Sequence, residues 1–251
     1  MADSIIETSG LTRRFGHFVA VDAISFDVAK GEVFGFLGAN GAGKTTAIRM
    51  LTGLLAPSDG RATVAGFDVA TQSEQIKRNI GYMSQRFSLY DDLTVRENIR
   101  LYGGIYDLSP ATIDDRMQEI LGRLGLSDME RTLVRALPLG WKQKLAFSVA
   151  LLHRPQAVFL DEPTSGVDPI TRRQFWEMIY DTAHSGTTVL VSTHYMDEAE
   201  YCDRLLMMVA GKVAASGTPA DLKKQYGVDS IDELFVRLAR SANGAVAGLP
   251  A

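Results

Sequence analysis

A glycine-rich segment that ends in a lysine and two threonines, residues 38–46, has the residue types of a phosphate-binding loop. It follows an apolar run of strand length, 33–37, and precedes apolar residues with the spacing of one helix face. Glycines let the backbone curl so that several N–H groups can donate to phosphate oxygens, and a helix N-terminus adds its positive dipole end. Strand, loop and helix together predict a phosphate site; a glycine-rich turn with an exposed lysine is the alternative.

The residues of this loop have different expected tasks in binding a nucleoside triphosphate. We expect Lys44 to reach the β- and γ-phosphates, the Thr45 hydroxyl to ligate Mg²⁺, and Thr46 to contact the α-phosphate. The other residues expected around the phosphates are Gly38, Asn40, Gly41, Ala42 and Gly43.

Two adjacent carboxylates, Asp161 and Glu162, follow a second apolar run, 157–160, which is typical of a central parallel strand. Successive side chains on a strand point to opposite faces, so we expect the two carboxylates to have different tasks. Carboxylates beside such a run are costly to bury unless a cation compensates them. A Mg²⁺ ion that arrives with the nucleotide would compensate one of them directly.

Length and composition exclude several classes of protein. The 251 residues are 46% hydrophobic and 22% charged, with a net charge of −4 and a single cysteine. This charge predicts no general attraction to nucleic acid, and one cysteine cannot form an intrachain disulfide. The longest apolar runs fall far short of the ~20 residues that span a bilayer, and the N-terminus does not resemble a signal peptide. We expect a cytosolic chain whose membrane role depends on a partner.

Hydrophobic periodicity predicts strands at the N-terminus and helices in the middle of the chain. Residues 5–36 are expected to form short strands, in which Ile24, Phe26 and Val28 alternate with polar residues as in a sheet with one wet face. The expected helices are 72–79, 93–106, 110–124, 140–153, 169–184, 219–226 and 231–240. The later strands are expected at 62–65, 80–83, 157–160 and 187–191, with two more within 204–216.

Taken together, these segments resemble the nucleotide-binding subunit of an ABC transporter over nearly the whole chain. The most specific match is residues 159–168, which correspond to the family's Walker B segment and D-loop. Gln85 matches the Q-loop glutamine, His194 the switch histidine, and Phe15 the aromatic A-loop position, all in the family's order. On spacing alone Phe15 is either a core residue or an aromatic platform for a purine ring, and the resemblance favours the platform.

The resemblance implies an α/β fold: a P-loop NTPase (RecA-like) core with a mainly parallel sheet, an N-terminal antiparallel β subdomain and an inserted α-helical subdomain. It implies a single ATPase domain over residues 1–240, and the small-residue tail 241–251 is expected to be disordered. Within the domain, the core and β subdomain are expected at 1–86 and 156–216, the helical subdomain at 87–155 and C-terminal helices at 217–240. The C-terminal stretch is similar to ATPases of bacterial drug, antibiotic and lipid exporters.

The family's residue roles carry over onto the matching positions. Asp161 is expected to hold Mg²⁺, and Glu162 to act as the base or the positioner for the attacking water. Gln85 is expected to touch Mg²⁺ or that water, His194 to contact the γ-phosphate, and Asp168 to reach a second subunit. The implied substrate is ATP with Mg²⁺. The implied partners are transmembrane permease subunits and a second cassette, as a homodimer or a pair, on the inner face of the cell membrane, with no nucleic acid.

The family's signature, L-S-G-G-Q, has a divergent counterpart in residues 137–141. Proline replaces the serine, leucine one glycine, and tryptophan the glutamine. In the family this motif caps the γ-phosphate bound to the opposite subunit, but Pro138 offers neither a hydroxyl nor an N–H. The N–H groups of Leu139, Gly140 and Trp141 remain as expected donors, helped by the helix dipole. The alternative is a proline-started helix that does not contact nucleotide.

Several functions remain open on the sequence. The first is a MgATP-hydrolysing subunit that powers a membrane exporter; residues 86–92, with three apolar side chains, are then expected to contact its membrane partner, or else to cover the helical subdomain. The second is a soluble ABC ATPase that acts on ribosomes or DNA. The third is a weakly hydrolysing or non-hydrolysing ATP-binding module, which the altered signature favours and the intact Lys44 and Glu162 oppose. The chain could also be half of a twin-cassette polypeptide.

Overall fold

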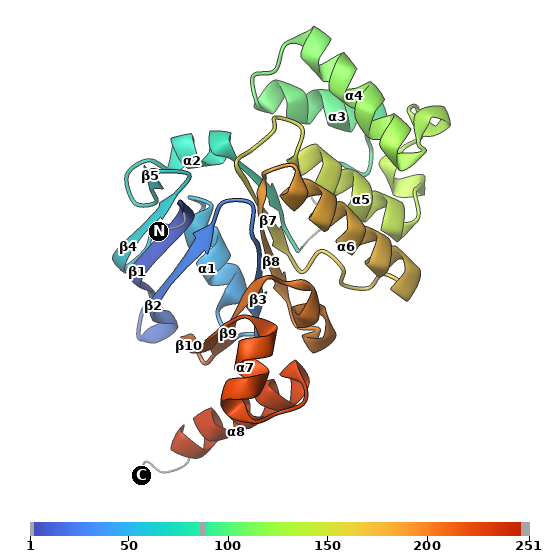
Figure 1. Cartoon of the computed structure of the whole chain (residues 1–251). Helices are drawn as coiled ribbons and strands as arrows, with labels where there is room; N and C mark the ends of the chain where they lie inside the picture. Colours follow the sequence, from blue (N-terminus) through green and yellow to red (C-terminus); the bar gives the residue numbers. More distant parts are fainter. Residues whose placement is uncertain (1–2, 86–88, 247–251) are drawn as a thin grey trace.

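The computed structural model describes residues 3–85 and 89–246, which form two β-sheets and the helices that pack between and beside them (Figure 1). The strands are β1 (Ser4–Phe15), β2 (Phe18–Ala29), β3 (Val33–Leu37), β4 (Asp59–Val64), β5 (Phe67–Asp68), β6 (Ile80–Met83), β7 (Ala157–Asp161), β8 (Thr188–Thr193), β9 (Arg204–Val209) and β10 (Lys212–Gly217). The smaller sheet is antiparallel, in the order β2-β1-β4-β5. The larger sheet has the order β10-β9-β3-β8-β7-β6.

Eight α-helices and three short 3₁₀ helices are described. The α-helices are α1 (Lys44–Leu51), α2 (Ser73–Asn79), α3 (Val95–Ile105), α4 (Pro110–Leu124), α5 (Leu139–Ala150), α6 (Pro169–His184), α7 (Pro219–Tyr226) and α8 (Ile231–Val246), and the 3₁₀ helices are η1 (Ser127–Met129), η2 (Val134–Ala136) and η3 (Met196–Tyr201). Helices α3, α4 and α5 follow β6 in the chain and lie with α6 on the side away from the antiparallel sheet (Figure 1). Within the described residues no helix is both long and apolar enough to cross a bilayer.

The N-terminal strands differ from the expected short ones, because β1 and β2 are twelve residues each and form one long hairpin. Several register shifts interrupt their pairing, and such bulges let long strands bend without ending. Ile24 and Val28 are buried while Ser25 and Asp27 are exposed, as the alternation predicts. The expectation of short strands is therefore wrong in length, although the one-sided burial is confirmed.

The larger sheet brings the ends of four strands to one edge. Strands β3, β6, β7, β8 and β9 run parallel, and only β10 is antiparallel. The carboxyl ends of β3, β6, β7 and β8 therefore lie together, at the place where ligands bind in open α/β sheets. The phosphate-loop segment, Gln85, Glu162 and His194 each follow one of these ends.

Strand β7 shows how the core is divided. Val158 and Leu160 belong to the apolar cluster built with α5 and α6, whereas Ala157 and Phe159 belong to the cluster around α1, which lies between the two sheets. Burial on both faces explains why this strand is apolar throughout. The expected fold, a mainly parallel α/β core with an antiparallel β subdomain and helices, is confirmed.

Helices α7 and α8 lie at the opposite end of the molecule from α3 and α4 (Figure 1). Helix α8 continues to Val246, so the expectation of a disordered tail from Ser241 is wrong for residues 241–246. The Ser241 hydroxyl donates to the Arg237 carbonyl one turn earlier (3.0 Å), which ties the start of this stretch to the helix. Residues 247–251 lie outside the described part of the chain.

His153 connects the helices to the larger sheet. Its ring stacks on Tyr106, with centroids 3.6 Å apart, and its Nε2 lies 3.0 Å from the carbonyl oxygen of Ile80. Because that partner is an acceptor, Nε2 carries the proton and donates it. Burial lowers the pKa of His153 to about 4, so the ring is neutral near pH 7.

This histidine should make the free energy of unfolding depend on pH. Its folded pKa lies below the unfolded value of about 6.5, so its contribution is complete above pH 6.5 and is lost as the pH falls toward 4. Between pH 7 and pH 5 we expect this group to remove about 2 kcal/mol. Urea unfolding at both pH values should show a smaller loss in His153→Gln than in the wild type. Equal losses in the two proteins would contradict the assignment.

Candidate nucleotide-binding and hydrolysis site

The phosphate-loop segment lies between β3 and α1. Gly43 ends the loop with a φ of 104°, and a Cβ there would lie 2.5 Å from the Ala20 carbonyl oxygen, so this position requires glycine. The first N–H groups of α1 have no acceptor inside the helix and face a cavity of about 310 Å³. Loop residues that line this cavity are Asn40, Gly41, Gly43, Lys44, Thr45 and Thr46. The structure thus places most of the expected phosphate contacts around one cavity.

Lys44 is buried, with 4% of its surface exposed. Its Nζ donates to the carbonyl oxygens of Gly38 (2.7 Å) and Ala39 (3.3 Å), and lies 3.5 Å from Glu162 Oε1. Burial lowers the pKa of Lys44, and the carboxylate of Glu162 opposes that shift. Phosphate oxygens are stronger acceptors than neutral carbonyls, so a triphosphate in the cavity would compete for this ammonium group. Ala42 is buried and lies on the far side of the loop, where its carbonyl accepts from the Gly211 N–H (3.1 Å).

Asp161 ends β7 and is almost completely buried. Its Oδ1 accepts from the hydroxyls of Ser192 (2.6 Å) and Thr45 (3.2 Å), whereas its Oδ2 is buried without a hydrogen-bond partner among the described residues. A buried carboxylate oxygen of this kind needs an explanation, and the hard oxygens of Asp161 and Thr45 fit Mg²⁺, which takes one or two protein ligands beside phosphates. Gln85, the third expected ligand, directs its amide nitrogen to Glu162 instead.

Glu162 lies just beyond β7 and not on it. Its φ of 51° is in the left-handed region, which costs of order 1–3 kcal/mol for such a residue, and its N–H donates to the Ser192 carbonyl (3.1 Å). The Ser192 hydroxyl also lies 3.0 Å from this N–H. The strand ends at Asp161, so the expectation that the two carboxylates point to opposite faces of one strand is wrong, and the strained turn sets the direction of the Glu162 side chain.

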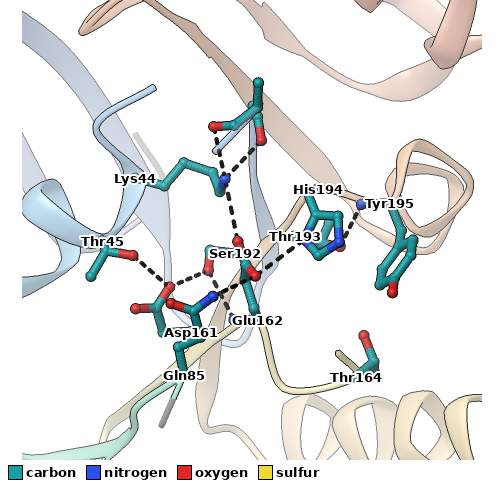
Figure 2. A network of polar contacts seen from close by, with 12 residues as sticks. Lys44, Thr45, Gln85, Asp161, Glu162, Thr164, Ser192, Thr193, His194 and Tyr195 are labelled. Carbon is teal, nitrogen blue, oxygen red and sulfur yellow. Dashed lines mark hydrogen bonds and ion pairs between the residues drawn. The ribbon is translucent and has the colours of Figure 1, made fainter. Parts of the chain in front are cut away.

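Three polar side chains surround the Glu162 carboxylate, which is 6% exposed (Figure 2). Its Oε2 accepts from Gln85 Nε2 (2.9 Å) and lies 3.1 Å from His194 Nδ1, while Oε1 faces Lys44. The three partners come from three different segments that meet at the sheet edge. A carboxylate held in one orientation beside a phosphate loop can position a water molecule or accept its proton.

Two phenylalanines lie at the tip of the β1–β2 hairpin. Phe15 is 47% exposed, and the guanidinium of Arg13 lies 4.7 Å from its ring centroid. Phe18, its partner across the turn, is 65% exposed and lines the cavity, whereas Phe15 does not. The core alternative for Phe15 is thus wrong, and two exposed rings are available to a purine.

Asp168 caps the N-terminus of α6 within its own chain. Its Oδ1 accepts from the N–H groups of Ile170 and Thr171 (both 3.0 Å), and the Thr171 hydroxyl donates to Oδ2 (2.6 Å). These hydrogen bonds lower the pKa of Asp168, and the one from the Thr171 hydroxyl has the largest effect. Ile170 is 73% exposed and Leu139 is 45% exposed, so apolar side chains project from the first turns of α6 and α5.

The divergent signature opens helix α5. Pro138 is its N-cap without a side-chain hydrogen bond, and the Trp141 N–H donates to the Pro138 carbonyl (3.0 Å). Trp141 is therefore engaged inside the helix, which leaves Leu139 and Gly140 as N–H groups without a helical acceptor. A Cβ on Gly140 would lie 2.7 Å from the Thr171 methyl group, so this glycine permits the close approach of α5 to α6.

Restoring the hydroxyl and N–H donors that Pro138 lacks should raise basal ATP hydrolysis. Pro138→Ser with Leu139→Gly adds a hydroxyl and an N–H, and one recovered hydrogen bond in a dry site is expected to raise the rate about three- to thirtyfold. Steady-state phosphate release measures this. Pro110→Ser, which changes a helix-starting proline of α4, is the control. An unchanged or lower rate in a folded double variant would mean that the motif acts by packing.

Three residues of the site were not expected from the sequence. Ser192 connects Asp161 with the Glu162 backbone, and Phe18 and Ala20 line the cavity. The signal for Ser192 is a polar residue that follows the apolar run of β8, two positions before His194. Phe18 carried no signal beyond its place three residues after Phe15.

Comparisons with known proteins give one consistent family. The ABC transporter family model matches residues 21–165. The chain is 45% identical over 241 residues to the probable multidrug ABC transporter ATP-binding protein YbhF of Escherichia coli (strain K12), covering 94% of this chain and 42% of that protein. It is 39% identical over 251 residues to the daunorubicin resistance ATP-binding protein DrrA3 of Streptomyces coeruleorubidus, covering 100% of this chain and 79% of that one.

A solved structure of the ATP binding subunit of an ABC transporter superposes with a TM-score of 0.84 at 32% identity, and covers 93% of this chain and 99% of that one. The chain spans less than half of the length of the Escherichia coli relative. The family model covers more than half of the chain, and its range includes the phosphate loop, Gln85 and Glu162. With its fold and sequence in agreement, the chain belongs to the ABC transporter family, as one of its ATP-binding cassettes.

Proposed function

We propose that the chain binds and hydrolyses MgATP and drives an ABC exporter through ATP-dependent dimerisation against transmembrane subunits. The observation that carries this proposal is the Glu162 carboxylate, held by Gln85 and His194 beside the phosphate loop and Lys44. The multidrug and antibiotic-resistance names of the relatives favour an exporter. The chain would then lie in the cytoplasm, on the inner face of the membrane.

Different residues of the chain have different roles in binding and hydrolysis. First-turn N–H groups of α1 and the Lys44 ammonium bind the phosphates, and Phe15 or Phe18 stacks on the adenine. Glu162 orients the attacking water and accepts its proton, while His194 is placed to contact the γ-phosphate. Asp161 and Thr45 would hold Mg²⁺, which neutralises charge on the phosphate oxygens when bound. The burial of Lys44 and Glu162 strengthens each of these electrostatic contacts.

A second copy, or a paired cassette, would complete the site. Leu139 and Gly140 lie at the start of α5 and Asp168 at the start of α6, on adjoining first turns. The exposed side chains of Leu139 and Ile170 there are apolar, which suits burial against another cassette. We infer that these turns face the nucleotide bound to the partner cassette.

The surface after Gln85 is the proposed contact with the membrane subunits. Residues 86–88 lie outside the described part of the chain. Leu89 is buried in the helical cluster, in keeping with the alternative that this loop covers the helices, but Tyr90 is 55% exposed. Buried Asn98 fixes the loop, since its amide accepts from the Tyr90 N–H (2.8 Å) and donates to the Tyr90 carbonyl (3.0 Å). Tyr90 is thus a large side chain presented to solvent on a fixed backbone.

Site-specific crosslinking tests the proposal. Cys202, the chain's single cysteine, is buried and burial raises its pKa, so a cysteine introduced by Tyr90→Cys can be labelled selectively with a photo-crosslinker. In membranes of the source cells we expect a product with an integral membrane protein, and none from the control Val236→Cys on α8. A product with ribosomal proteins would support a soluble ABC ATPase instead. A chain that releases no phosphate from MgATP would support a non-hydrolysing module.

A further inference from the structure

A cluster beside His194 has no task in the proposed function. Tyr195 directly follows the histidine, Arg172 lies in the first turns of α6, and Glu198 lies in η3. These residues come from two segments that pack against each other behind the hydrolysis site.

Tyr195 contacts both His194 and Arg172. The centroids of the His194 and Tyr195 rings are 4.2 Å apart, with an interplanar angle of 35°, and Figure 2 shows the two rings side by side. The Arg172 guanidinium carbon lies 4.2 Å from the centroid of the Tyr195 ring, which is a cation–π contact. The contacts therefore run from Arg172 through Tyr195 to His194, and from His194 to Glu162.

A buried carboxylate anchors the arginine. Glu198 is completely buried; its Oε1 accepts from the Thr164 hydroxyl (2.6 Å) and lies 3.5 Å from Arg172 Nε. Asp197 adds a second, more distant contact, 3.7 Å from Arg172 Nη1. Glu198 Oε2 and Arg172 Nε have no hydrogen-bond partner among the described residues, so the ion pair between the two residues is what offsets the cost of this buried charge and keeps the arginine beside Tyr195. Thr164 belongs to the turn that follows Glu162. The cluster therefore contacts this one segment twice, through Glu198 at Thr164 and through His194 at Glu162.

We propose that Arg172 and Tyr195 are positioning residues that hold the His194 ring against Glu162 during hydrolysis. His194 is 29% exposed and lies beyond the end of β8, where the sheet ladder no longer restrains it. Without the stacked tyrosine, its imidazole would sample other rotamers and leave the water site. This inference rests on the proposed role of His194 at the γ-phosphate.

Steady-state hydrolysis by the full chain, measured with [γ-³²P]ATP so that slow rates are resolved, tests the proposal. Tyr195→Leu should lower kcat about two- to twelvefold with KM for ATP changed less than twofold, because an aromatic contact is lost but the phosphate loop is intact. Tyr195→Phe keeps the ring and should retain the wild-type rate. Arg172→Ala should lower kcat in the same way, whereas Arg173→Ala, a highly exposed neighbour on α6, should not.

The decisive measurement repeats Tyr195→Leu in a His194→Ala background. If Tyr195 acts only through the histidine, the second substitution has no further effect; a purely structural role lowers the rate in both backgrounds. A normal rate in His194→Ala alone would reject the proposed role of His194. A slow His194→Ala with a normal Tyr195→Leu would reject only the positioning role. If Tyr195→Leu does not fold, Tyr195→Met carries the same cycle, because it also removes the ring and leaves the ion pair between Arg172 and Glu198 intact.

Discussion

Glu162→Gln is expected to bind MgATP with nearly wild-type affinity and to hydrolyse it about 10²–10⁴-fold more slowly, the largest effect among the substitutions considered. Glutamine keeps the shape of the side chain and can still accept from Gln85, but it cannot take a proton from water. Single-turnover hydrolysis and a separate binding titration measure the two effects. Glu74→Gln, which changes an exposed carboxylate on α2, is the matched control.

The same variant provides a test of the dimer. If hydrolysis is what separates two cassettes, Glu162→Gln should elute as a dimer with ATP and as a monomer without it. A strictly monomeric elution with ATP would contradict the composite site. A wild-type rate of hydrolysis would instead make Glu162 a structural carboxylate, strained at φ 51° for the fold alone.

Local signals predicted the helices better than the strands. Helices α4 and α6 begin where the sequence indicates, because Ser109 and Asp168 cap them and a proline occupies the first turn of each, and α4 ends before a glycine in the left-handed conformation, Gly125. The length of the β1–β2 hairpin was not predictable in the same way, since bulges interrupt its pairing and β1 also pairs with β4 along its other edge. Strand length is decided by neighbours that periodicity does not show.

The features of the site also differ in how far the sequence predicts them. The residue types around the phosphate loop could be predicted because their spacing on a strand, loop and helix has a chemical reason. The contacts of Glu162 could not, since Gln85, Lys44 and His194 meet only through the order of the parallel strands. The strained backbone of Glu162 ends the strand, so the alternation of side chains between the two faces does not extend to this residue. Such departures from local sequence rules are expected at functional sites.

Lys44→Ala is expected to weaken MgATP binding at least about tenfold. The substitution removes a charge-assisted phosphate contact worth about 1.5–3 kcal/mol, and every 1.4 kcal/mol is a factor of ten in affinity. Lys44→Met separates the charge from the packing, because it keeps most of the buried stem but not the ammonium group. Both variants should lose affinity to a similar degree. Lys77→Ala, an exposed lysine on α2, should not.

Calorimetric titration with a non-hydrolysable ATP analogue and Mg²⁺ measures these affinities without interference from turnover. Lys44 now donates to two loop carbonyls and lies 3.5 Å from Glu162, so binding must exchange the carbonyl contacts for stronger ones to phosphate. The alanine variant also removes the cation nearest Glu162, so hydrolysis at saturating ATP should fall together with affinity. An unchanged affinity would mean that the triphosphate lies elsewhere. A loss in Lys44→Ala but not in Lys44→Met would mean that the buried stem supports the loop and the charge does not bind phosphate.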